Sequence, residues 1–154
     1  MLRKDFITRE DQLQETVELG AAAVLLIRAA LDENMFRMLY EKALKLDLEP
    51  LVEVHAEEEM AFVRTLGAGL VGINNRNIMT LEQDDGGPDR TVRLASGAPA
   101  DALLVSESGI VSPGDARLAV SAGANAVLVG TALWRAQDMG AMYTSLRVER
   151  SVLF

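Results

Sequence analysis

The stretch at residues 101–110, Asp-Ala-Leu-Leu-Val-Ser-Glu-Ser-Gly-Ile, has the residue types best suited to chemistry. Its apolar run, 102–105, predicts a buried strand that leads directly into Ser-Glu-Ser-Gly at 106–109. A carboxylate, two hydroxyls and a glycine suit the protein core poorly. They suit a site at the carboxyl end of a parallel strand, where α/β proteins commonly bind ligands. We therefore expect residues 106–109 to form part of a functional site.

Other apolar runs also carry polar residues at or just after their ends. These residues are Lys4, Glu53, Asn74, Arg76, Glu107, Ser108, Gly130 and Thr131. Glu53 lies between Val52 and Val54, so a strand would point it to the face opposite its neighbours. Lys4, Glu53 and Glu107 at one end of a parallel sheet would make an acid/base set. An ion pair between Lys4 and one of the two glutamates explains the same residues equally well.

Glycines mark two of the predicted loops. Gly109 and Gly130-Thr131 would expose backbone N–H groups beside short helical turns. Loops of this kind after the last two strands commonly bind phosphate in parallel barrels. The alternative is that the glycines only permit tight turns.

The elements that must position these residues alternate along the chain. We expect strands over Leu2–Phe6, Ala22–Ile27, Leu51–Val54, Leu70–Ile73, Ala102–Val105 and Ala126–Val129. Helical spacing or capping signals follow Thr8, Asp32 and Ser112-Pro113, and cover Ala56–Leu66, Asp89–Ala95 and Met139–Val148. Strand–helix–strand units need crossovers, so the sheet should be parallel. The predicted fold class is α/β, with about six strand–helix units; the resemblance described below implies a TIM-type (βα) barrel truncated to these units.

Composition narrows the class of protein. The 154 residues suit one domain over 1–154, and the net charge of -8 argues against nucleic acid as a partner. The apolar runs are too short to cross a bilayer, no signal peptide is evident, and cysteine is absent. We expect a cytoplasmic protein with no membrane or nucleic-acid partner. His55 has no metal-ligand spacing around it and is interpreted as a strand-end or helix-start residue.

Six stretches together resemble the indole-3-glycerol-phosphate synthase family, in the family's order and over nearly the whole chain. They are residues 2–7 (LRKDFI), 23–27 (AVLLI), 51–54 (LVEV), 72–76 (GINNR), 105–110 (VSESGI) and 127–133 (VLVGTAL). The resemblance implies a (βα)8-barrel carboxy-lyase of tryptophan biosynthesis. Such enzymes close and decarboxylate 1-(2-carboxyphenylamino)-1-deoxyribulose 5-phosphate, releasing carbon dioxide and water. It implies an anionic phosphorylated substrate and neither cofactor nor metal.

The resemblance also implies catalytic roles. Lys4 would protonate the ribulose carbonyl during ring closure, and Glu53 would be the acid/base residue of the dehydration. Glu107 would position the lysine. Asn74 and Arg76 would lie around the anthranilate ring and its carboxylate, for which a planar guanidinium is suited.

Substrate-binding roles follow in the same way. Leu25 would be an apolar wall for the ring, and Ser108 would hydrogen-bond near the substrate. Gly109, Gly130 and Thr131 would bind the phosphate, with Thr131 where the family more often has Ser.

The chain also departs from the family. It begins at what would be the third strand, so it corresponds to strands three to eight, and the family's first-strand glutamate and lysine have no counterpart. Asn77 stands where the family usually has Asp, and the loop at 84–90 looks expanded. An open barrel would expose strand edges and apolar surface. We therefore expect a homo-oligomer, a complementing N-terminal partner chain, or closure as a distorted smaller barrel.

Three functions remain open from the sequence. The first is an indole-3-glycerol-phosphate synthase that needs the missing N-terminal units. The second is a catalytically inactive truncated paralogue that keeps phosphate binding or an assembly role. The third is another phosphate-binding barrel enzyme, against which the motifs at 4–6 and 74–76 argue.

Overall fold

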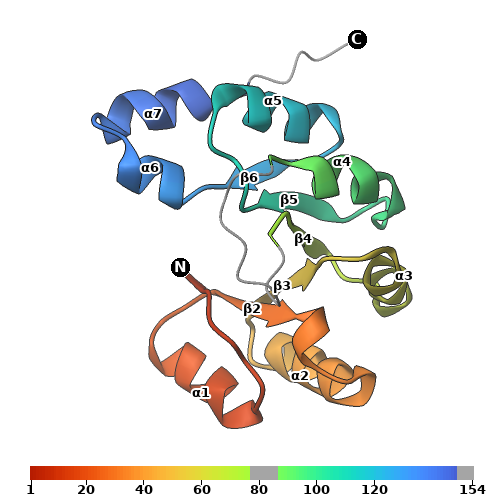
Figure 1. Ribbon diagram of the computed structural model, residues 1–154. Helices are drawn as coiled ribbons and strands as arrows, with labels where there is room; N and C mark the ends of the chain where they lie inside the picture. The colour runs from red at the N-terminus through yellow and green to blue at the C-terminus, as the bar shows by residue number, and fades with distance from the viewer. Residues whose placement is uncertain (77–86, 149–154) are drawn as a thin grey trace. The chain divides into compact units, whose positions relative to one another are not determined.

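The computed structural model describes residues 1–76 and 87–148 (Figure 1). The strands are β1 (Leu2–Arg3), β2 (Ala23–Ile27), β3 (Glu49–Val54), β4 (Leu70–Asn74), β5 (Leu103–Glu107) and β6 (Ala126–Leu128). The helices are α1 (Glu10–Glu18), α2 (Glu33–Lys45), α3 (Glu57–Leu66), α4 (Asp89–Leu94), α5 (Pro113–Ser121), α6 (Thr131–Arg135) and α7 (Met139–Leu146). Two 3₁₀ turns, η1 (Arg28–Ala30) and η2 (Ala95–Gly97), complete the described elements.

The strands follow one another in the sheet as they do in the chain, in the order β1-β2-β3-β4-β5-β6. The pairs β1–β2, β2–β3 and β5–β6 are parallel. Parallel neighbours require a crossover between them, which the intervening helices supply. The predicted fold class, a TIM-type α/β fold with about six strand–helix units, is confirmed.

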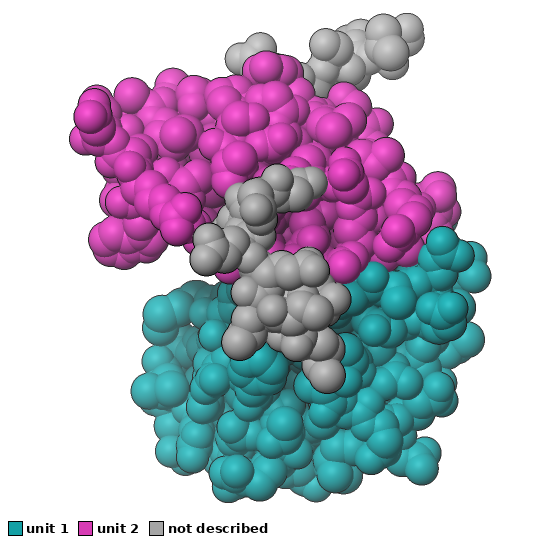
Figure 2. Space-filling view, viewed as in Figure 1, with its two compact units in different colours: residues 1–72, 98–102 teal, residues 73–97, 103–154 magenta. Residues whose placement is uncertain are grey.

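The chain divides into two compact units (Figure 2). Unit 1 contains residues 1–72 and 98–102, and unit 2 contains residues 73–97 and 103–154. Strand β4 begins in unit 1 and ends in unit 2. The single partial domain over residues 1–154 stays a prediction.

Unit 1 buries the apolar stripe of α2. Phe36, Leu39 and Ala43 recur at helical spacing and are fully buried, as are alternate residues of β2 and β3. The Asp32 side chain accepts a hydrogen bond from the Met35 N–H at 2.9 Å, which confirms the predicted N-cap of α2. Burying such a stripe against parallel strands is what holds β2 and β3 in place.

Unit 2 has its own small core. Its buried members are Ile110, Ala116, Ala119, Ala124 and Leu146. The small alanines of α5 allow the helix to lie close to its neighbours, and the predicted Ser112-Pro113 start of α5 is confirmed. Ser112 accepts from the Asp115 N–H at 3.2 Å, and the Asp115 carboxylate accepts from the Ser112 N–H at 2.8 Å.

Several elements differ from the predicted ones, and four of these differences follow. Strand β1 ends at Arg3, not Phe6, and β5 continues through Glu107, because Glu107 still pairs with Leu128. The Gln12 side chain accepts from the N–H of Thr8 and of Arg9, so the N-cap of α1 is Arg9 and not Thr8. A fourth difference is α6, a short helix that was not predicted. Asn77 and residues 84–86 of the loop at 84–90 lie outside the described residues.

Candidate active site

Strand register assigns three predicted site residues of unit 1 to one face of the sheet. Glu53 pairs with Ile27, and Leu25 pairs with Leu51, so Leu25 and Glu53 share a face. Arg3 pairs with Val24 on the other face, where it donates to the Gln12 carbonyl of α1 at 2.8 Å. Lys4 therefore follows β1 on the face of Leu25 and Glu53.

Lys4 and Glu53 form an ion pair on that face. The Lys4 Nζ donates to Glu53 Oε2 at 3.2 Å. The Glu53 side chain is 2% exposed, whereas that of Lys4 is 42% exposed. A buried carboxylate is costly unless it is paired, so the contact with Lys4 offsets part of the cost of burying Glu53. The lysine also keeps access to solvent, as a group that exchanges protons must.

Arg76 and Thr131 meet in unit 2. The Arg76 Nη2 donates to Thr131 Oγ1 at 3.2 Å, and its backbone N–H donates to Asn74 Oδ1 at 3.0 Å. Arg90 Nη1 donates to the carbonyls of Asn74 and Arg76, at 2.8 and 2.6 Å. A guanidinium is thus held next to the hydroxyl predicted to bind phosphate, with a second guanidinium fixing its backbone. Such cations suit an anionic substrate in a chain with net charge -8.

Glu107 is fully buried at the end of β5. It pairs with Leu128, whereas its neighbour Ser106 pairs with Val127. Alternation along the strands therefore places Glu107 and Ser106 on opposite faces. The predicted polar stretch 106–109 is thus divided between two environments.

Asn75, which was not predicted as a site residue, connects that stretch to two other segments. Its Nδ2 donates to Ser106 Oγ at 3.0 Å and to the carbonyls of Glu107 and Ser108, at 2.9 and 3.0 Å. Its Oδ1 accepts from the N–H and the hydroxyl of Thr91, both at 3.0 Å. Thr91 and Ser106 are themselves 2.7 Å apart between their hydroxyl oxygens. One amide side chain therefore sets the path of the backbone at 107–108.

The two residues after Glu107 have left-handed backbones. Ser108 has φ 61° and Gly109 has φ 69°. A Cβ added at Gly109 would lie 2.6 Å from the Gly87 carbonyl oxygen. Positive φ is uncommon for a residue other than glycine, and such conformations concentrate at functional sites. Gly130 differs, because its φ is -121° and no atom of the described residues lies within 4 Å of an added Cβ.

This contrast gives a prediction on stability. Gly109→Ala should lower the free energy of unfolding by about 2 kcal/mol or more, because it adds both a clash and left-handed strain. Gly130→Ala should change it by less than about 1 kcal/mol, since its backbone and surroundings accept a methyl group. Urea unfolding of both variants followed by circular dichroism measures the difference. Equal losses would contradict the prediction.

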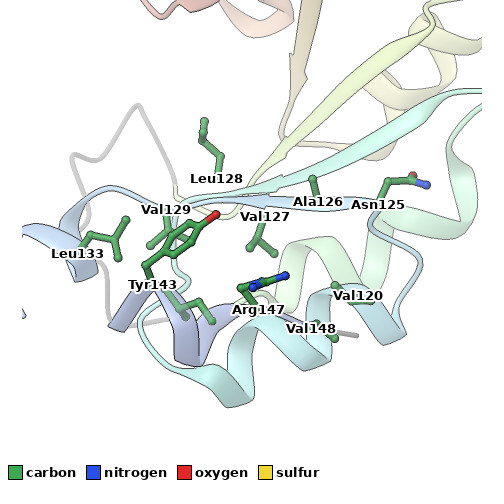
Figure 3. Close-up of a pocket in the computed structure, with 11 residues that line it drawn as sticks. Val120, Asn125, Ala126, Val127, Leu128, Val129, Leu133, Tyr143, Arg147 and Val148 are labelled. Carbon is green, nitrogen blue, oxygen red and sulfur yellow. The ribbon is translucent and has the colours of Figure 1, made fainter. Parts of the chain in front are cut away.

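A separate pocket of unit 2 is apolar (Figure 3). It has a volume of about 330 Å³ and lies between β6, α5 and α7. Figure 3 shows Val127 and Leu128 pointing to opposite sides of the strand. None of the predicted site residues lines this pocket. The predicted polar sites thus lie elsewhere.

Two kinds of feature are absent from the described residues. There, no group of three or more His, Cys, Asp or Glu residues is placed to hold a metal ion. Within residues 1–76 and 87–148, every helix is too short or too polar to cross a membrane.

Comparison with known proteins matches these residues to a family. The family model described as indole-3-glycerol phosphate synthase matches residues 1–146. The chain belongs to the indole-3-glycerol phosphate synthase family. An indole-3-glycerol phosphate synthase from Listeria monocytogenes serotype 4a (strain HCC23) is 47% identical over 150 residues, covering 97% of this chain and 58% of the relative. Another, from Shouchella clausii (strain KSM-K16), is 45% identical over 139 residues, covering 90% and 53%.

Coverage and fold complete the comparison. The chain spans about half the length of these curated synthases. The 3-hexulose-6-phosphate synthase from Salmonella typhimurium has a TM-score of 0.78 at 16% identity, covering 94% of this chain and 70% of that one. The thiamine phosphate pyrophosphorylase from Pyrococcus furiosus has a TM-score of 0.65 at 18% identity, covering 90% and 62%. At such identities the likeness concerns the fold alone.

The structure thus places the synthase-like residues in two groups. Lys4, Leu25 and Glu53 share one face in unit 1. The group in unit 2 consists of Asn74, Arg76, Glu107, Ser108, Gly109, Gly130 and Thr131. Three residues that the sequence did not single out for the site also contact these groups: His55, Asn75 and Arg90. Their roles show only in the tertiary structure, because each of the three contacts a residue or backbone segment that it reaches only after the chain has folded.

Proposed function

We propose that this chain supplies strand–helix units three to eight of an indole-3-glycerol phosphate synthase. The reaction closes the indole ring of 1-(2-carboxyphenylamino)-1-deoxyribulose 5-phosphate. The aromatic ring carbon attacks the protonated ribulose carbonyl carbon, the ring carboxylate leaves as carbon dioxide, and the new hydroxyl leaves as water. The enzyme class would be a carboxy-lyase.

The ion pair between Lys4 and Glu53 is the observation that carries this proposal. Ring closure needs an acid at the carbonyl oxygen, and dehydration needs an acid/base group at the new hydroxyl. A half-exposed lysine at 3.2 Å from a buried glutamate provides both kinds of group side by side. We assign Lys4 to carbonyl protonation and Glu53 to dehydration, and by family resemblance Glu107 to positioning the lysine.

The remaining residues would hold the two ends of the substrate. We assign Asn74 and Arg76 to the anthranilate ring and its carboxylate, and the buried, apolar Leu25 to the ring face. Gly109, Gly130 and Thr131 would bind the phosphate, with Ser108 beside them; this list follows the family resemblance. Among the described residues, the open space around an added Cβ at Gly130 supports a phosphate there.

The whole reaction would require the part of the synthase that this chain does not match. The chain covers 58% of the Listeria relative, so the remainder of that protein holds the other units. We propose that activity depends on a complementing N-terminal segment or on self-association.

The test is fluorescence of indoleglycerol phosphate formed from the anilino substrate. The chain would be assayed alone and after co-expression with the N-terminal segment of the Listeria synthase that it does not match. Turnover in the co-expressed pair, absent from either part alone, supports the proposal. No turnover in any combination, with both parts folded and bound to each other, would overturn it.

The alternative, an inactive paralogue that keeps phosphate binding, is decided in the same preparation. Calorimetric titration with the reduced, unreactive form of the substrate measures binding without turnover. Binding that is lost on Thr131→Val, with no activity at any stage, would favour this alternative. Light scattering at several concentrations tests self-association, which a monomer throughout would exclude.

A further inference from the structure

His55 lies between two carboxylates of unit 1. Its Nε2 is 3.4 Å from Glu53 Oε1, and its Nδ1 is 3.6 Å from Glu59 Oε2. The side chain is 11% exposed, and neither ring nitrogen has a hydrogen-bond partner of good geometry among the described residues. The two carboxylate oxygens are therefore the nearest acidic groups on either side of this ring.

The start of α3 fixes this arrangement. Glu59 lies in the first turn of α3, four residues after His55, and its Oε2 accepts from the His55 backbone N–H at 2.8 Å. Burial raises the pKa of Glu59, but the His55 hydrogen bonds and the charge of Arg28 outweigh it, so the pKa of Glu59 is lowered. Glu59 is thus an anion that anchors the His55 backbone and faces its ring.

A different basic side chain faces each carboxylate oxygen of Glu53. Lys4 Nζ is 3.2 Å from Oε2, and His55 Nε2 is 3.4 Å from Oε1. The charged groups around the ring are therefore Lys4 and Glu53 from the strand side and Glu59 from α3. Arg28 from η1 acts on Glu59 and pairs with Glu33 of α2 at 3.4 Å. The carboxylate between Lys4 and His55 cannot turn without losing one of the two contacts.

We propose that His55 is a positioning residue that holds the Glu53 carboxylate in register with Lys4 and bridges it to Glu59. The proposal rests on the proposed function, because it gives Glu53 its acid/base role. His55 itself does not touch the substrate. It acts by fixing the rotamer of Glu53.

Two conservative variants separate this role from a purely structural one. His55→Gln places an amide N–H near the position of Nε2 and keeps the contact with Glu53. His55→Asn places one near Nδ1 and keeps only the contact with Glu59. In the co-expressed pair, His55→Asn should lower kcat about 10- to 100-fold with KM nearly unchanged, and His55→Gln should restore much of the loss. If His55→Asn kept a higher kcat than His55→Gln, the role of His55 would be limited to stabilising the start of α3, and the proposal would be wrong.

The pH dependence of kcat is a second measurement, which a purely structural role of His55 would leave unchanged. A nearby cation favours the ionised carboxylate, so removing it should move the acidic limb of the kcat profile of His55→Gln to higher pH. An unchanged limb would contradict the electrostatic part of the proposal.

A further experiment, by NMR, does not depend on catalytic activity. The chain contains one histidine, so one imidazole signal reports the titration of His55 by NMR. Loss of a facing anion lowers the affinity of the ring for its proton, so Glu53→Gln should lower the titration midpoint by about 0.5 pH unit or more. Glu57→Gln, at an exposed position of α3, should leave it unchanged. Lys4→Met should raise it, because a competing cation is removed.

The kinetic and NMR experiments together distinguish failure of the His55 proposal from failure of the proposed function. An unmoved midpoint in Glu53→Gln, with Glu59→Gln lowering it, would overturn the link between His55 and Glu53. A moved midpoint in a protein without turnover would support the link and refute only the proposed function.

Discussion

Lys4→Ala should lower kcat about a thousand-fold, a loss that is typical when an enzyme loses its general acid. The substitution removes the group assigned to protonate the carbonyl and leaves Glu53 without the contact at 3.2 Å. The free energy of unfolding should fall by only about 1–3 kcal/mol. That is less than for a fully buried pair, because the Lys4 side chain is 42% exposed and solvent screens the interaction. Single-turnover fluorescence of the co-expressed pair measures the rate, and urea unfolding measures the stability.

Two further variants show whether the lysine acts by its charge or by its proton. Lys4→Arg keeps a cation near Glu53, but a guanidinium does not give up its proton at working pH, so kcat should stay low. Lys42→Ala is the matched control: its side chain is also 42% exposed and pairs with Glu10 at 3.6 Å. It should leave kcat within about twofold of the original value. Full activity of Lys4→Arg would show that Lys4 contributes charge and not a proton.

Asn75→Ala should lower the free energy of unfolding by about 3–5 kcal/mol, the largest loss expected among the variants proposed for this chain. The total free energy of unfolding of a domain is about 5–15 kcal/mol. The change removes an amide that bonds Ser106, the carbonyls of Glu107 and Ser108, and Thr91. Thr91 and Ser106 are fully buried, so water does not readily replace these bonds. Urea unfolding of the 154-residue chain, followed by circular dichroism, measures the loss.

The comparison variant for this experiment is Asn125→Ala. Asn125 also bonds backbone through its side chain, accepting from the Leu104 N–H at 2.8 Å, but it is exposed. Its loss should cost about 1 kcal/mol, because water can take over the contact. Asn75→Asp should resemble Asn75→Ala, since a carboxylate cannot donate to the three oxygens that face Nδ2. Equal effects at positions 75 and 125 would contradict the assigned role of the network.

The proposed binding of the substrate also depends on the hydrogen bonds of Asn75. Ser108 and Gly109 hold left-handed backbones with φ 61° and 69°. Asn75 bonds the carbonyl of Ser108, so the predicted phosphate loop inherits its shape from a side chain about 30 residues earlier in the chain. In the co-expressed pair, Asn75 variants that remain folded should therefore raise KM more than they lower kcat.

Local structure was readable from the sequence because its causes are local. The apolar runs predicted all six strands, and the caps Asp32 and Ser112 were identified from residue type alone. Gly67 ends α3 with φ 69°, as its position after a helical stripe indicates. Boundaries were less certain, since they depend on pairing: β5 extends to Glu107 because Leu128 lies opposite it. The polar residues at strand ends were likewise visible as a pattern, and the resemblance they carry led to the family.

By itself, then, the sequence determined the order of elements, the parallel α/β class, the family and the types of group available for chemistry. Only the tertiary structure decided which groups meet. Lys4 contacts Glu53 across 49 residues, Asn75 bonds residues 31–33 positions away, and His55 turns from a strand-end residue into a bridge between Glu53 and Glu59. Hydrophobic periodicity encodes which face is buried, but side-chain contacts depend on strand register and helix placement, which arise only when the chain packs.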